Sequence, residues 1–153
     1  MSDEILNKVA NSALVVFDLE DYYPNGIRTQ IDLSHWLFEG FLLREKDFRE
    51  SLKNHDWSQY ENHYVAIHCG TDAIVPAWAS ILVTTYVAPF AKKVVLGTIN
   101  DLNTALYQEI LNEIDYSQYQ DKPLILKGCS HKPVPESAYV FAVQQLQKFA
   151  KSI

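Results

Sequence analysis

The sequence predicts an α/β fold: a single three-layer domain in which a mostly parallel sheet lies between helices. Apolar strand-like runs alternate with helical segments from residue 64 onward, a pattern typical of parallel sheets covered on both faces. Two segments of the chain also repeat each other, which indicates two equivalent strand–loop–helix units. The length of 153 residues suits one domain spanning residues 1–153.

The first part of the chain predicts two strands and one long helix. Residues 14–18 form a short apolar run that ends in acids, which indicates a buried strand, and residues 27–31 fit an edge strand. Ser34 is expected to cap a helix, because apolar residues recur at helical spacing from Trp36 to Leu52.

The rest of the chain predicts three strands and three helices in alternation. The strands are expected at residues 64–68, 93–97 and 123–126. Residues 101–114 form an amphipathic helix, and the other two helices begin at Pro76 and Pro135. Proline suits the first turn of a helix, where its missing N–H costs nothing.

Residues 56–79 and 115–138 align without a gap at an offset of 59 residues. Seven of the 24 positions are identical, and they cluster at both ends of the alignment. Two copies are too few for a solenoid. They fit two equivalent units within one sheet.

Charge and hydropathy exclude several classes of protein. The net charge of -6 argues against broad nucleic-acid binding, which needs a basic surface. Residues 73–91 carry no charge, but their prolines and hydroxyl residues favour a buried helix over a membrane span. The N-terminus lacks a basic region and a long apolar stretch, so it is not a signal peptide and we expect a cytoplasmic protein.

Cys69 and Cys129 are the two cysteines of the chain, and each lies in the same loop of its repeat copy. Both loops follow the carboxyl end of a predicted strand and precede a helix that begins at a proline. Ligands gather at the carboxyl ends of strands in α/β sheets, and helix N-termini favour thiolates. We therefore expect the two thiols to face one another and to bind zinc or iron, with Asp72 or His131 completing the ligand set and His68 as a further candidate.

Two other interpretations stay open. One cysteine is a nucleophile or redox thiol with a histidine as its base, which makes the protein a thiol-dependent enzyme or switch. Alternatively, both cysteines are buried small hydrophobes and the protein is a non-catalytic interaction module, such as a homodimer. The sequence contains none of the phosphate-binding or dinucleotide-binding glycine motifs, so no nucleotide cofactor is expected.

Three long segments resemble the bacterial proteins grouped as domain of unknown function 2480: LLREKDFRESLKNHDWSQY, HCGTDAIVPAWA and LKGCSHKPVPESAYV. The resemblance runs from about Val15 to the last helix. It implies no established activity, but it does imply a link to accessory proteins of iron–sulfur assembly as partners.

The resemblance also implies which loop residues belong to the family pattern. They are Cys69, Thr71, Asp72 and Pro76 in the first loop, and Cys129, Ser130 and Pro135 in the second. The family pattern continues into a Cys-Ser-x-Val-Pro element that the residues up to Ile153 do not contain. His131 is not part of the pattern, which makes Asp72 the stronger third ligand.

Overall fold

The computed structural model describes residues 14–128 and 130–153. The chain divides into two compact units. Unit 1 consists of Met1–Pro24 and Asn103–Ile153, and unit 2 consists of Asn25–Leu102. Unit 2 is therefore inserted, in the sequence, between the two segments of unit 1.

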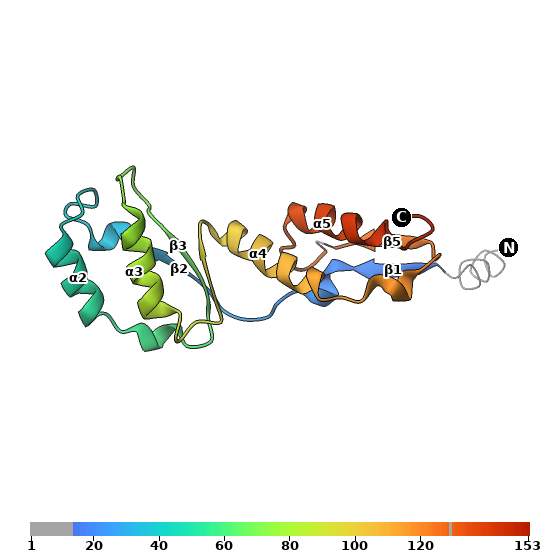
Figure 1. The fold of residues 1–153 in the computed structure, drawn as a ribbon, viewed down its shortest axis with the longest axis horizontal. Helices are drawn as coiled ribbons and strands as arrows, with labels where there is room; N and C mark the ends of the chain where they lie inside the picture. Colours follow the sequence, from blue (N-terminus) through green and yellow to red (C-terminus); the bar gives the residue numbers. More distant parts are fainter. Residues whose placement is uncertain (1–13, 129) are drawn as a thin grey trace. The chain divides into compact units, whose positions relative to one another are not determined.

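Unit 2 contains a three-stranded parallel sheet in the order β2-β3-β4. Its elements are β2 (Arg28–Asp32), a 3₁₀ turn (Leu33–Trp36), α2 (Glu45–Asn54), a 3₁₀ turn (Trp57–Tyr60), β3 (Tyr64–His68), α3 (Ala77–Val87) and β4 (Lys93–Leu96). Figure 1 shows α2 and α3 side by side, and the rings of Phe48 and Trp78 meet edge to face between them.

The helices of unit 2 form because their apolar residues recur on one face. Phe48 and Leu52 of α2 are four residues apart and fully buried, and Ala79, Val83 and Val87 form the same kind of row on α3. These rows pack with alternate residues of the strands into one hydrophobic core.

Unit 1 contains a two-stranded parallel sheet formed by β1 (Val15–Asp18) and β5 (Leu124–Lys127). Its other elements are a 3₁₀ turn (Leu19–Tyr22), α4 (Ile99–Asn112), which begins within unit 2, a 3₁₀ turn (Tyr116–Tyr119) and α5 (Glu136–Leu146). On α5, the buried row is Ala138, Ala142 and Leu146, and it packs into a separate core with Phe17 and Tyr107.

The two repeat copies fold in the same way, and the structural equivalence is longer than the sequence repeat. Asp56 and Asp115 each cap a 3₁₀ turn through their carboxylates, with nearly the same backbone angles. The side chains of Trp57 and Tyr116, again 59 residues apart, donate to the carbonyl oxygens of Leu52 and Leu111. The equivalence thus reaches back into α2 and α4.

The predicted α/β class, with parallel strands and two repeat-related units, is confirmed. The described strands form two sheets, however, where the sequence predicted one. The reason is that each repeat copy buries its strands and helices in its own core. Each copy pairs with the nearest preceding strand, β2 with β3 and β1 with β5.

The long helix expected from Ser34 to Leu52 is wrong. Asp32 caps a short 3₁₀ turn by accepting from the Ser34 N–H, that turn ends at Trp36, and α2 begins only at Glu45. In the described part of the chain, no helix is both long and apolar enough to cross a bilayer, and α3 occupies only eleven residues of the uncharged segment.

Candidate functional site

Cys69 follows β3 directly and lies at its carboxyl end, as predicted, with its side chain half-buried. Cys129 lies outside the described residues, so the pairing of the two thiols stays a prediction. Its flanking residues do show the equivalent loop: Gly128 follows β5, and Pro135 stands before α5 as Pro76 stands before α3.

The loop that carries Cys69 is held by the carboxylate of Asp32. Parallel pairing places Asp32 opposite His68, at the carboxyl ends of β2 and β3. The Oδ1 atom of Asp32 accepts from the Gly70 N–H at 2.8 Å and from the Ser34 N–H at 2.9 Å. A Cβ atom at residue 70 would collide with this carboxylate, so glycine is required by the close approach.

These hydrogen bonds also set the protonation of Asp32. Partial burial raises the pKa of Asp32, but the hydrogen bonds from Gly70 and Ser34 outweigh this effect and lower it to about 2. The His68 imidazole acts in the same direction to a smaller extent. Asp32 is therefore a fixed negative charge one strand away from the Cys69 loop at neutral pH.

Thr71 ties the same loop to the turn around Gly40. Its hydroxyl donates to the Gly40 carbonyl oxygen at 2.6 Å, and its Oγ1 atom lies 3.5 Å from the Cys69 Sγ atom. Since the single hydroxyl proton is used at Gly40, the Cys69 thiol is the donor in the second contact. A metal ion on Sγ would take the place of this thiol proton.

Asp72, the third predicted ligand, lies in the same loop with an exposed side chain. Within residues 14–128 and 130–153, no three His, Cys, Asp or Glu side chains are placed to hold a metal ion together. Cys69 with its described neighbours thus does not form a complete site, and a metal would need ligands beyond this set.

The equivalent loop of unit 1 is also held by a carboxylate, but from a different position. The Oε1 atom of Glu20 accepts from the backbone N–H groups of His131, at 2.5 Å, and Lys132, at 3.0 Å. These bonds, first the one from His131, lower the pKa of Glu20. The His131 side chain itself is exposed.

Sequence reasoning overlooked Asp32 and Glu20 as residues that position the cysteine loops. Asp18, the residue equivalent to Asp32, serves only as a cap, accepting from the Glu20 N–H at 3.0 Å. The signal that could have found them is the acid at the end of each strand that precedes a repeat copy. Without the pairing of β1 with β5 and β2 with β3, nothing in the sequence connects these acids to the loops.

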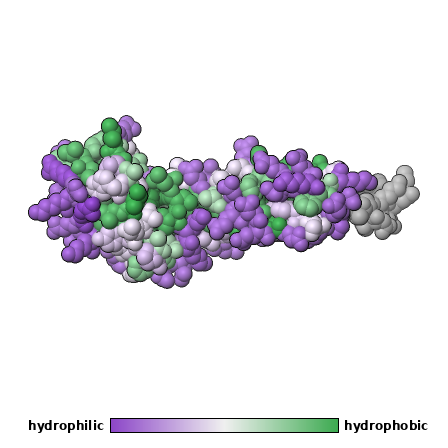
Figure 2. Space-filling model, in the orientation of Figure 1, coloured by the Kyte–Doolittle hydropathy of each residue, from purple (hydrophilic) through white to green (hydrophobic). Residues whose placement is uncertain are grey.

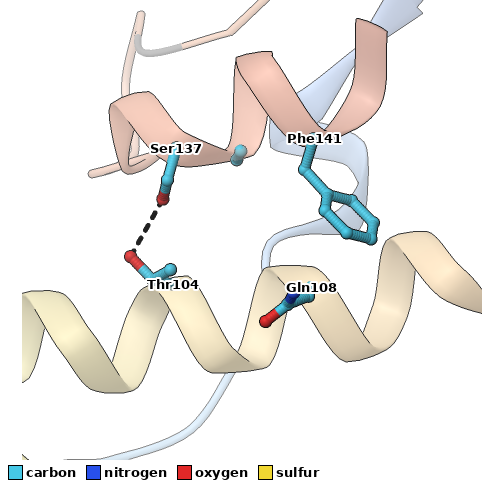
Figure 3. Close-up of a pocket in the computed structure, with 5 residues that line it drawn as sticks. Thr104, Gln108, Ser137 and Phe141 are labelled. Carbon is cyan, nitrogen blue, oxygen red and sulfur yellow. Dashed lines mark hydrogen bonds between the residues drawn. The ribbon is translucent and has the colours of Figure 1, made fainter. Parts of the chain in front are cut away.

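A small hollow of about 90 Å³ lies between α4 and α5 (Figure 3), lined by Thr104, Gln108, Ser137, Ala138 and Phe141. The hydroxyls of Thr104 and Ser137 are hydrogen-bonded across it at 2.9 Å. In unit 2 the residue equivalent to Ser137 is Trp78, whose ring packs on Phe48 at 5.8 Å. The hollow therefore reflects a small residue at one repeat position.

Comparison with known proteins adds the family. No curated protein and no solved structure matches the chain. A family model described as "Protein of unknown function (DUF2480)" matches residues 3–153, which is almost the whole chain. The chain, with its two equivalent cysteine loops, belongs to this family.

Proposed function

We propose that the protein binds a zinc or iron ion through Cys69 and Cys129 and serves as an accessory protein in metal or iron–sulfur cluster handling. The observation that carries the proposal is the equivalence of the two loops. Each follows a parallel strand, is held by a carboxylate through backbone N–H groups, and precedes an eleven-residue helix capped by a proline.

The described geometry around Cys69 supports a ligand role. The backbone on either side of the sulfur is fixed, by β3 before it and by the bonds of Gly70 and Thr71 after it. The side chain is half-buried, so its thiol is available to an ion without large loop movement. A fixed loop lowers the entropy that ordering a ligand costs on binding.

Asp72 and His131 complete the proposed ligand set, one from each loop. Both side chains are exposed and can turn toward an ion at the cost of rotamer freedom alone. Thiolate, imidazole and carboxylate groups together are the donors that zinc accepts in tetrahedral sites. Iron accepts the same thiolates, and the two metals are distinguished by measurement.

Metal analysis of the chain purified without chelator tests this proposal. We expect one bound ion for each chain, and a loss of about tenfold or more in affinity in Cys69→Ser and in Cys129→Ser, because each removes a thiolate ligand. Ser130→Ala, in the same loop as Cys129, is the matched control and should keep the metal. Full metal content in both cysteine variants would overturn the proposal, and visible absorption would identify iron.

One observation favours a second candidate, a non-catalytic interaction module. Ile74, in the loop after β3, is 94% exposed, and the neighbouring turn at Gly40 carries the exposed Phe41 and Leu42. Figure 2 shows apolar surface at the tip of that loop. Contiguous exposed apolar side chains mark interaction surfaces. Light scattering tests it: a dimer mass that Ile74→Asp converts to a monomer mass would favour this candidate, with or without bound metal.

A further inference from the structure

Unit 1 lacks most of a strand that unit 2 has. In unit 2, β4 runs along the outer side of β3, paired from Tyr64↔Lys93 to Ile67↔Leu96. The positions 59 residues later, Pro123 and Ser152, also form a parallel bridge. The pairing thus begins at the equivalent place, beside β5, near the chain end marked in Figure 1.

The first hydrogen bond between this missing strand and β5 is already present. The Leu124 N–H donates to the Ser152 carbonyl oxygen at 2.8 Å. In unit 2 the last such bond, from the Gly97 N–H to the Ile67 carbonyl oxygen, is also 2.8 Å long. Its equivalent acceptor in unit 1 is the carbonyl oxygen of Leu126.

The remaining pairing groups on this side of β5 can be assigned from the ladder. Alternate residues of a parallel strand direct their N–H and C=O groups to the same neighbour. The Val15 N–H donates to the Pro123 carbonyl oxygen at 2.9 Å, so residues 123, 125 and 127 face β1. Leu124 and Leu126 therefore face the outer edge, and no described backbone group pairs there with the N–H or C=O of Leu126.

The sheet face next to this edge is apolar and exposed. Val16 and Ile125 lie opposite each other in β1 and β5, and their exposed fractions are 51% and 44%. In unit 2, the residue equivalent to Ile125 is Ala66, which is fully buried and pairs with Val95 of β4. A third strand with an apolar residue at the position of Val95 would extend the apolar row formed by Val16 and Ile125.

We propose that the outer edge of β5 binds an extended segment of a second polypeptide as a third parallel strand. The segment pairs with the carbonyl group of Leu124 and both backbone groups of Leu126, and it places an apolar side chain beside Ile125. Its register continues from Ser152, as β4 of unit 2 shows. Addition of a strand to an open edge is a common mode of peptide recognition, in which backbone bonds give affinity and alternate side chains give selectivity.

The amide proton of Leu126 reports on this edge directly. The first test appends a copy of residues 95–98 of the chain (Val-Leu-Gly-Thr) after Ile153, because tethering raises the effective concentration of a weakly binding strand. We expect exchange of the Leu126 amide proton to slow by about tenfold or more when it becomes paired. The matched control carries proline in place of the appended valine, which removes the N–H that donates to the Leu124 carbonyl oxygen.

A free peptide tests whether a separate polypeptide can supply the strand. The acetylated peptide Val-Leu-Gly-Thr-Ile, at millimolar concentration, should shift the Leu126 amide resonance of the unmodified chain and not that of the extended chain. Unchanged Leu126 exchange in the extended chain, or equal protection by the proline control, would overturn the inference. Protection in the extended chain with no effect of the free peptide would overturn the part that assigns the strand to a second polypeptide.

Discussion

Unit 1 and unit 2 use one scaffold and differ in what they place on it. The 3₁₀ caps at Asp56 and Asp115, the carbonyl acceptors at Leu52 and Leu111, and the rows of buried residues on α3 and α5 are shared. The loops, the sheet edges and the space between the helices are not. Shared features are those that hold each core together, and they leave the surface features free to diverge.

The carboxylate that holds each cysteine loop illustrates this freedom. Asp32 stands at the end of β2, whereas Glu20 stands two residues beyond the end of β1 and has a longer side chain. The two acids accept from different backbone N–H groups of equivalent loops. The same task, fixing the loop after a strand, is thus met from two sequence positions.

The largest effect is expected from the shared core. Leu52→Ala in unit 2 and Leu111→Ala in unit 1 each remove a fully buried side chain at equivalent positions. Each should lower the free energy of unfolding by about 2–5 kcal/mol, since a cavity remains. Urea unfolding followed by circular dichroism measures both. A cost well under about 1 kcal/mol for one of them would show that the equivalent positions are not energetically equivalent.

The next effect separates the two copies at one repeat position. Trp78→Ala removes a half-buried ring that packs on Phe48 and lies under Arg49, and should cost roughly 2–3 kcal/mol. Ser137→Ala, its equivalent in unit 1, removes only an exposed hydrogen bond to Thr104 and should change stability by less than about 0.5 kcal/mol. Thermal unfolding of both variants checks the contrast, and equal costs would remove it.

The smallest effect concerns acid stability. The folded pKa of Asp32 is about 2, below its ordinary value of 3.8, so the ionised form stabilises the fold above that ordinary value. This contribution, about 1–2 kcal/mol because the side chain is still 23% exposed, is lost as the pH falls from about 4 to about 2. Asp32→Asn should therefore be less stable at pH 7 and show a shallower loss in that window.

Unfolding of the wild type and of Asp32→Asn between pH 2 and pH 5 measures the difference. Other carboxylates with lowered pKa, such as Glu20, contribute the same slope to both proteins and cancel. Parallel curves for the two proteins would mean that the Asp32 bonds to Gly70 and Ser34 do not stabilise the loop.

Periodicity and prolines in the sequence predicted most of the helices and strands. Residues 64–68 are a strand as predicted, and the helices begin directly after Pro76 and Pro135. The segment from Ser34 to Leu52 misled because its apolar residues recur at helical spacing, while Asp32 stops a helix there by capping a short 3₁₀ turn. A local cap overrode a pattern of side chains.

The order of residues along the chain determined the fold class, the repeat and the place of Cys69 at the end of a strand, since all three follow from local patterns and from the 59-residue offset. The division into two sheets, the role of Asp32 and Glu20, and the open edge of β5 were decided by tertiary pairing. Which strands pair depends on burial and hydrogen bonds between residues far apart in the chain, and no local pattern contains that information.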